Sequence, residues 1–192
     1  MDLADVLDSG LSYRTFTPDL EVRASGDGRT IFGILVPFGV PKRVEYGLVE
    51  QFRHGAFDHQ LADPARVRLT RDHIAHGGKL IGRAVMFRND AKGLYGELRV
   101  SKTPAGDETL ELVKDGALRE LSIGFRERQN KRLRDGTVER VTADLREVAV
   151  VLEGAYGELA VAMGVRHRVA TPNLDQARRL LDALPELDTA NV

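Results

Sequence analysis

The sequence predicts a mostly β protein of the α+β class, with a closed or nearly closed β-barrel flanked by a few helices. Strand-like patterns of apolar residues recur in many short segments, whereas helical spacing is confined to a few stretches. Turn residues separate the strand-like segments, as they do in barrels built from hairpins. A chain of 192 residues is long enough for one domain with its own core.

Most of the expected elements are strands. Turn chemistry divides the first strands from one another, at Ser25-Gly26-Asp27-Gly28 and again at Pro41-Lys42. The residues between the turns alternate or run apolar, and the same pattern returns through the rest of the chain. We therefore expect strands over residues 20–24, 30–38, 45–52, 66–71, 79–88, 94–101, 121–129, 138–142 and 144–152.

Helices are expected at three places. The stretch 103–115 carries the clearest signals, because Thr103 can cap the helix, Pro104 suits its first turn and Gly116 ends it. A second, short helix is expected over residues 55–62. The third opens at Thr171-Pro172 and ends at Pro185, and its apolar residues recur at helical spacing: Leu174, Ala177, Leu181 and Leu184.

The chain divides into three expected parts. Residues 1–19 have weak periodicity and many turn residues, which predicts a flexible N-terminal arm. Residues 20–165 would form the barrel domain. Residues 166–192 would form a C-terminal helix and tail.

Composition limits the classes of partner. Lys and Arg number 28 against 29 Asp and Glu, a net charge of -1, so no global field favours nucleic acid or an anionic membrane. The acidic N-terminus is unlike a secretory signal, and no apolar run reaches membrane-spanning length. Without cysteine the chain has no disulfide and no thiolate metal site. We expect a soluble intracellular protein that needs no cofactor and acts on a protein or peptide.

Glu147 is the residue whose expected position is physically most costly. Both faces of the strand 144–152 are apolar and so expected to be buried, with Glu147 on the face of Leu145, Ala149 and Val151. An ionised carboxylate left unpaired in a core costs on the order of several kcal/mol. Glu147 should therefore have a partner, either a histidine N–H or an arginine in a structural ion pair.

His73 follows the strand 66–71 in phase with Val67 and Leu69, so it is expected at the rim of the barrel, pointing inward. Imidazole ordinarily titrates near neutral pH, so a histidine oriented by a carboxylate can act as a general base. A surface or structural histidine would fit the same pattern. Asp72, His73 and His76 could also hold a metal ion, but the cluster lacks a helical spacing and an obvious third anchor, and we expect no metal site.

Ser122 lies in Leu121-Ser122-Ile123-Gly124-Phe125, where the three apolar residues would face one way and the serine the other. The sequence lacks the Gly-x-Ser-x-Gly elbow of α/β-hydrolases. What remains is a strand-borne serine that His73 precedes and Glu147 follows in the chain. A serine, a histidine and a carboxylate near or within strands are the inventory of a nucleophilic hydrolase.

With these residues the chain resembles the prohead proteases of tailed bacteriophages, which are related to the herpesvirus assembly proteases called assemblins. The resemblance covers roughly residues 20–160 and rests on short motifs that follow one another in a fixed order. They are Glu50-Gln51-Phe52-Arg53-His54-Gly55-Ala56-Phe57, Arg71-Asp72-His73, Ile81-Gly82-Arg83, Asp90-Ala91-Lys92-Gly93-Leu94, Leu121-Ser122-Ile123-Gly124-Phe125 and Glu147-Val148-Ala149-Val150-Val151.

The resemblance implies an assemblin-like barrel and a serine endopeptidase. Ser122 would be the nucleophile, His73 the general base and then general acid, and Glu147 the third catalytic residue, which orients the imidazole. The implied substrates are the scaffolding segment of the major capsid protein and the protease itself, cut inside the assembling prohead in the host cytoplasm. Residues before Leu20 and after about Arg166 would be natural self-cleavage sites. Because assemblins work as dimers, a homo-oligomer is also among the implied partners.

The chain departs from the family's pattern two residues after the glutamate, where a serine is frequent and Ala149 stands here. Two other functions remain open: a non-catalytic capsid-assembly protein that keeps the same barrel, and a metal-dependent hydrolase that uses Asp72, His73 and His76. The intact serine, histidine and glutamate argue against the first, because a non-catalytic relative has no chemical reason to retain all three.

Overall fold

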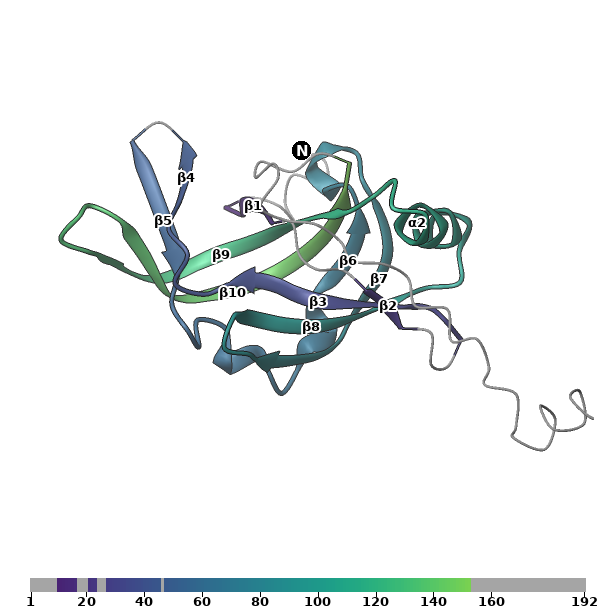
Figure 1. The fold of residues 1–192 in the computed structure, drawn as a ribbon, viewed down its shortest axis with the longest axis horizontal. Helices are drawn as coiled ribbons and strands as arrows, with labels where there is room; N and C mark the ends of the chain where they lie inside the picture. The colour runs from purple at the N-terminus through teal and green to yellow at the C-terminus, as the bar shows by residue number, and fades with distance from the viewer. Residues whose placement is uncertain (1–9, 17–20, 24–26, 46, 153–192) are drawn as a thin grey trace, which may run out of the picture.

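A strongly curled β-sheet forms the body of the protein (Figure 1). The computed structural model describes residues 10–16, 21–23, 27–45 and 47–152, and every structural statement below concerns these residues. The strands are β1 (Ser12–Phe16), β2 (Glu21–Arg23), β3 (Thr30–Pro37), β4 (Lys42–Glu45), β5 (Leu48–Phe52), β6 (Arg68–Arg71), β7 (Lys79–Asn89), β8 (Gly93–Val100), β9 (Glu120–Arg132) and β10 (Val138–Val151). The helical elements are the α-helix α2 (Pro104–Lys114) and the 3₁₀ helices η1 (Asp58–Gln60), η2 (Pro64–Arg66) and η3 (Ile74–His76).

The ten strands pair in the order β1-β9-β10-β6-β7-β8-β3-β2, with β5 on β10 and β4 on β5. Most neighbours are antiparallel, but β5 and β6 both run parallel to β10. The sheet bends into a nearly closed half-barrel (Figure 1). The predicted mostly β class and nearly closed barrel are therefore confirmed, with a single α-helix in the described part of the chain.

Several strand boundaries differ from those expected. The segments 138–142 and 144–152, expected as two strands, form one continuous strand, β10. Its pairing with β9 has register shifts, but they do not interrupt the strand. The segment 45–52 contains the turn of a hairpin between β4 and β5, because Gly47 adopts a positive φ of 78° that favours glycine. The expected strand 66–71 begins later, at Arg68, after the 3₁₀ helix η2.

β1 corrects the expectation of a flexible arm. Residues 12–16 pair in antiparallel register with β9, from Ser12 opposite Phe125 to Phe16 opposite Leu121. Arg14 also forms an ion pair with the buried carboxylate of Glu50, which helps to hold the strand in place. The sequence prediction missed β1 because its anchors lie far away in the chain. The remainder of the arm lies mostly outside the described residues, as does the segment 166–192.

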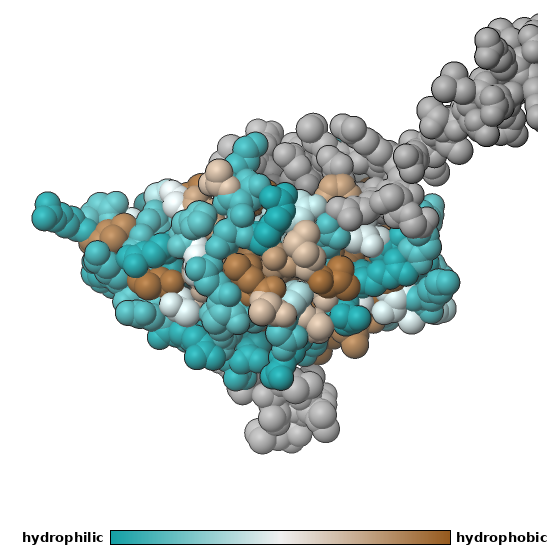
Figure 2. All heavy atoms as spheres, turned by 90° about the horizontal axis from the view of Figure 1, so that it is seen from below, coloured by the Kyte–Doolittle hydropathy of each residue, from teal (hydrophilic) through white to brown (hydrophobic). Residues whose placement is uncertain are grey.

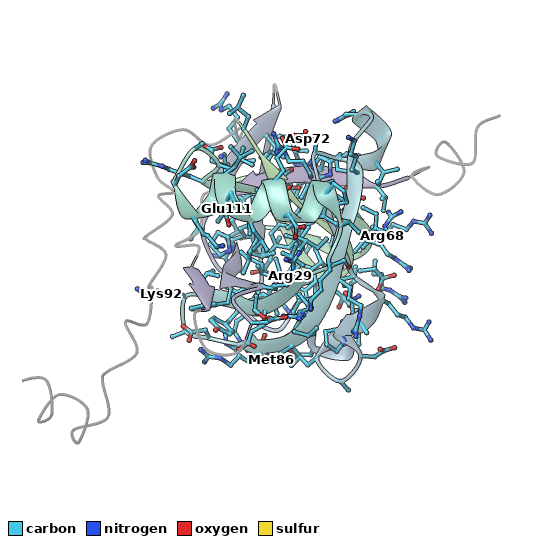
Figure 3. The ribbon with its side chains drawn as sticks, turned by 90° about the vertical axis from the view of Figure 1, so that its right-hand side faces the viewer. Arg29, Arg68, Asp72, Met86, Lys92 and Glu111 are labelled. Atoms are coloured by element: carbon cyan, nitrogen blue, oxygen red, sulfur yellow. The ribbon has the colours of Figure 1, made fainter. Side chains whose placement is uncertain are left out.

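The helix α2 forms as predicted. Thr103 Oγ1 accepts a hydrogen bond from Gly106 N at 3.1 Å, Pro104 occupies the first turn, and Leu110 and Val113 are buried. Figure 3 shows α2 across this side of the sheet, with Arg29 beneath it; Arg29 Nη2 lies 2.6 Å from Asp107 Oδ1. No helix among the described residues has the length and apolar character needed to cross a membrane.

The other two expected helices have different outcomes. Residues 55–62 form turns and the single 3₁₀ turn η1 instead of an α-helix. The chain there runs beside β10, where Ala56 O accepts a hydrogen bond from Ala143 N at 3.0 Å. The helix expected over 171–184 lies outside the described residues.

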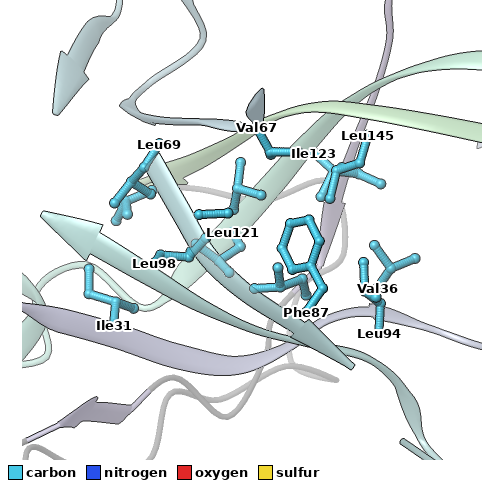
Figure 4. Packing of buried hydrophobic residues seen from close by; sticks show 14 of the residues in the cluster. Ile31, Val36, Val67, Leu69, Phe87, Leu94, Leu98, Leu121, Ile123 and Leu145 are labelled. Carbon is cyan, nitrogen blue, oxygen red and sulfur yellow. The ribbon is translucent and has the colours of Figure 1, made fainter. Parts of the chain in front are cut away.

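The core lies on one face of the curled sheet (Figure 4). It draws residues from nearly every long strand, among them Ile31, Leu69, Phe87, Leu98, Leu121, Ile123 and Leu145. The side shown in Figure 2 is mostly hydrophilic, with some apolar residues gathered near its centre. The residues of interest for function lie on the sheet face opposite this core.

Candidate active site

A β-bulge in β10 decides which way Glu147 points. Leu145 pairs with Phe125 of β9, but Glu147 pairs with the adjacent Gly124, so Arg146 is an extra residue in the ladder. Leu145 therefore packs in the core, while Glu147 lies on the opposite face. The expectation that Leu145 and Glu147 share a face is wrong, because it assumed an unbroken alternation along the strand.

The side chain of Gln60 holds β10 beside this bulge. Its Nε2 donates to Leu145 O at 2.9 Å, and its Oε1 accepts from Leu145 N at 2.7 Å. The amide group thus supplies the two hydrogen bonds that a neighbouring strand would supply, in the gap between the stretches of β10 that pair with β5 and β6. This contact fixes the backbone two residues before Glu147.

Ser122 lies on the face that its alternation predicts. Leu121, Ile123 and Phe125 belong to the core, and Ser122 points to the other side of β9. In the neighbouring strand β10 its register partner is Ala149, two residues after Glu147. The pairing of β9 with β10 therefore brings Ser122 and Glu147 to the same face, close together.

His73 reaches that face because the chain turns sharply after β6. Asp72 has a φ of 58°, which is rare for a residue other than glycine, and the 3₁₀ helix η3 follows directly. His73 therefore leaves the phase of Val67 and Leu69, which lie in the core. The expectation that it points inward with them is wrong, and the left-handed residue before it is the reason.

The structure brings Ser122, His73 and Glu147 together in one hydrogen-bonded chain. His73 Nε2 lies 2.6 Å from Ser122 Oγ, and His73 Nδ1 lies 2.8 Å from Glu147 Oε1. The three residues are 3%, 5% and 0% exposed, respectively. With the proton on Nδ1 donated to the carboxylate, Nε2 can accept the serine O–H, which is the arrangement that activates a serine nucleophile.

Glu147 has further partners that sequence reasoning missed. Its Oε1 also accepts from Thr70 Oγ1 at 3.0 Å and from Ile74 N at 3.3 Å. Its Oε2 forms an ion pair with Arg68 Nη2 at 3.2 Å. The side chains of Thr70 and Arg68 both come from β6. The only sequence signal for them was their place just before His73, because a local pattern does not reveal the parallel pairing of β6 with β10.

These partners set the charge state of Glu147. Burial alone would raise the pKa of its carboxyl group, but the hydrogen bond and positive charge of His73 oppose this. The hydroxyl of Thr70 and the charge of Arg68 add to them, and the pKa is lowered below its ordinary value. The carboxylate is therefore ionised at neutral pH and can orient the imidazole.

The Asp72, His73 and His76 cluster does not form a metal site. No group of three His, Cys, Asp or Glu side chains in the described ranges is placed to hold a metal ion. Asp72 Oδ2 lies 3.6 Å from Arg71 Nε, and the His76 ring meets the His73 ring edge-on with centroids 5.9 Å apart. Tyr13 of β1 packs against both rings, with its centroid 4.2 Å from that of His73.

One comparison with known proteins identifies a family, and another supports the fold. A model of the caudovirus prohead serine protease family matches residues 18–174. The structure is similar to that of the bacteriophage T4 capsid assembly protease, gp21, with 12% identity and a TM-score of 0.53 over 75% of this chain and 98% of that one. At this identity the likeness concerns the fold. No curated protein matches the sequence significantly. Because the family model spans most of the chain, the protein belongs to the caudovirus prohead serine proteases.

Proposed function

We propose that the protein is the endopeptidase of prohead maturation and that Ser122, His73 and Glu147 form its catalytic triad. The observation that carries the proposal is the pair of hydrogen bonds at His73, in which Nε2 accepts from Ser122 Oγ at 2.6 Å and Nδ1 donates to Glu147 Oε1 at 2.8 Å. Membership of a serine protease family supports the reaction class.

In this mechanism His73 Nε2 takes the proton of Ser122 as Oγ attacks the carbonyl carbon of the scissile peptide. Glu147 stabilises the imidazolium that forms and keeps the remaining proton on Nδ1. The tetrahedral intermediate collapses as His73 returns its proton to the leaving amine, which leaves an acyl-enzyme. A water molecule, deprotonated by His73, then hydrolyses the ester and restores the serine.

The proposed substrates are the scaffolding segment of the major capsid protein and the protease chain itself, cut inside the assembling prohead in the host cytoplasm. The family description places these enzymes in the prohead, and the similar T4 protein is a capsid assembly protease. For self-cleavage we propose sites before β1 and after about Arg166, because a strand paired within a sheet is a poor protease substrate. Copies of the chain would then meet one another as enzyme and substrate.

Intact-mass spectrometry tests the proposal. Purified wild type and Ser122→Ala are incubated alone and with the major capsid protein of the same phage carrying its scaffolding segment. We expect defined cuts in the wild-type samples, unchanged by EDTA, and none with Ser122→Ala, while both proteins give the same circular dichroism spectrum. Equal cleavage by Ser122→Ala would refute the assignment of the nucleophile.

A serine-directed fluorophosphonate gives an independent check. It should label wild type at Ser122, and peptide mapping would locate the adduct. Labelling at another serine, with cleavage lost in parallel, would assign the nucleophile elsewhere.

A further inference from the structure

We propose that Thr70 is a positioning residue of this active site, which holds the Glu147 carboxylate in the orientation that His73 requires. The inference rests on the proposed function, because it concerns the same triad. Thr70 is fully buried, and its Oγ1 donates to Glu147 Oε1 at 3.0 Å. The same carboxylate oxygen accepts the bond from His73 Nδ1 at 2.8 Å.

The register of β6 against β10 explains how Thr70 reaches the carboxylate. Arg68 is opposite Glu147, and Thr70 is opposite Ala149, so the two β6 residues are on the same face, two positions apart. The Arg68 guanidinium lies 3.2 Å from Oε2, whereas the Thr70 hydroxyl bonds to Oε1. Each carboxylate oxygen therefore has its own partner on β6.

Partners at both oxygens limit the rotation of the Glu147 carboxylate about its terminal side-chain torsion. The terminal torsion of a glutamate side chain is broad, so a carboxylate anchored at one oxygen can rotate. If Oε1 turned away from Nδ1, the imidazole would lose the acceptor that keeps the proton on Nδ1 and the lone pair of Nε2 directed at Ser122 Oγ. Without the Thr70 hydroxyl, Oε1 would keep only His73 and the longer bond from Ile74 N at 3.3 Å.

Ala149 offers a second place from which a hydroxyl can reach this carboxylate. It is the register partner of Thr70 and lies on the same face as Glu147, two residues further along β10. A serine at 149 would therefore have its hydroxyl beside the same carboxylate. If the required element is the hydroxyl rather than the threonine, Ala149→Ser should compensate for its loss at position 70.

The experiment compares Thr70→Val, which keeps the shape and removes the hydroxyl, with Thr70→Ser, Ala149→Ser and Thr70→Val/Ala149→Ser. The kinetic substrate is a quenched fluorescent peptide that spans the self-cleavage bond mapped in wild type. For Thr70→Val we expect a roughly tenfold lower kcat with an unchanged KM, in line with the loss of one hydrogen bond to a charged group. Thr70→Ser should stay near wild type, and the double variant should recover most of the loss.

Thr109→Val is the matched control for stability. Thr109 is also fully buried, and its Oγ1 donates to Ala105 O at 2.7 Å within α2. Both valine variants should lower Tm, but only Thr70→Val should lower kcat. A kcat equally reduced in the two variants, or reduced in Thr70→Val without rescue by the serine variants, would assign Thr70 a structural role instead.

Proton NMR gives a readout that needs no turnover. The His73 Nδ1 proton, identified by its absence in His73→Ala, should give a low-field resonance in wild type and Thr70→Ser that broadens by exchange with water in Thr70→Val. Should wild type cleave nothing, the proposed function fails, and this resonance alone decides the role of Thr70. An unchanged resonance in Thr70→Val, together with wild-type kcat where kcat is measurable, overturns the inference.

Discussion

The ring of Tyr13 occupies the space that any side chain at Gly124 would need. A Cβ on Gly124 would lie 3.0 Å from Tyr13 Cε1 and 3.3 Å from Glu147 Cβ. Tyr13 and Gly124 are register partners between β1 and β9, and the tyrosine ring also contacts the imidazole of His73. The absence of a side chain at Gly124 therefore lets one aromatic ring pack against both β9 and the catalytic histidine that we propose.

Gly124→Ala is expected to disturb the site through this contact. The added methyl group must displace either Tyr13 or Glu147, and overpacking of this kind costs about 1–3 kcal/mol. We expect the free energy of unfolding, measured in urea, to fall by that amount and kcat to fall with it.

The variant Tyr13→Ala supplies the control, because it removes the atoms that the methyl group meets first. The double variant Tyr13→Ala/Gly124→Ala should therefore lose less free energy of unfolding than the sum of the losses in the two single variants. Strictly additive losses would show that the ring is not what constrains Gly124.

His73→Ala should abolish cleavage almost as fully as Ser122→Ala does. The serine and histidine act as a unit, so once one of them is lost, substituting the other should not lower the cleavage rate further. We expect His73→Ala/Ser122→Ala to show the same residual rate as Ser122→Ala alone, measured by mass spectrometry after long incubation. A further drop in the double variant would mean that His73 contributes to cleavage independently of Ser122.

Glu147→Gln should be milder than His73→Ala, although still severe. The amide can accept a hydrogen bond from Nδ1 but carries no charge to stabilise the imidazolium, and its NH₂ group would face the Arg68 cation. We expect kcat to fall by roughly three orders of magnitude with the fold intact. A wild-type rate in Glu147→Gln would reduce Glu147 to a structural ion-pair partner of Arg68.

The sequence predicted those parts of the site that depend on local pattern. Alternation around Ser122 placed Leu121 and Ile123 in the core and the serine on the other face, as observed. The cost of burying a carboxylate correctly predicted that Glu147 has a histidine or arginine partner, and it has both. Likewise, the cap at Thr103 correctly predicted where the helix begins.

The parts that failed depend on contacts between distant segments or on single backbone torsions. The bulge at Arg146 is set by the register of β9 against β10, which no periodicity within one strand records. The left-handed torsion of Asp72 moves His73 off the phase of its strand, and aspartate gives only a weak signal for it. Thr70 was missed for the same reason as the bulge, because its role appears only once β6 is placed beside β10.

Glu147 should link folding stability to acid pH. Burial would raise its pKa, but the contacts with His73, Thr70 and Arg68 together hold the pKa below the ordinary value of 4.5. A carboxyl group with a lowered folded-state pKa contributes stability above its unfolded pKa, and the contribution is lost as pH falls through the folded value. We expect the free energy of unfolding to decline below about pH 4.5 and the decline to be smaller in Glu147→Gln.

Urea unfolding between pH 7 and pH 3 measures this difference. Asp144 and Glu139 also have lowered pKa values, but they are present in both proteins and cancel in the comparison. Parallel stability curves for wild type and Glu147→Gln would mean that the glutamate has the same pKa in the folded and unfolded chains.

A buried ion cluster centred on Glu50 should hold β1 on the sheet. Arg140 Nε and Nη2 lie 2.9 and 2.5 Å from Glu50 Oε2, and Arg14 Nη2 lies 3.1 Å from the same oxygen. Glu50 and Arg140 are 2% and 3% exposed, so Glu50→Gln would remove the buried counter-ion and leave Arg140 only its ion pair with the more exposed Glu127, at 2.7 Å. We expect a loss of roughly 3–5 kcal/mol in the free energy of unfolding. Amide hydrogen exchange over residues 12–16 should also become faster, because Arg14 is on β1.

Glu139→Gln is the matched control for this cluster, since β10 places Glu139 one residue before Arg140 and beside the same strand β5. Glu139 Oε2 accepts from Arg53 Nε at 3.0 Å, but the Arg53 side chain is 42% exposed, so water can solvate it when the pair is broken. Such a pair is worth about 1 kcal/mol or less, and its loss should leave hydrogen exchange over residues 12–16 unchanged. Equal effects of Glu50→Gln and Glu139→Gln would show that burial of the cluster is not what anchors β1, and would leave its backbone pairing with β9 as the cause.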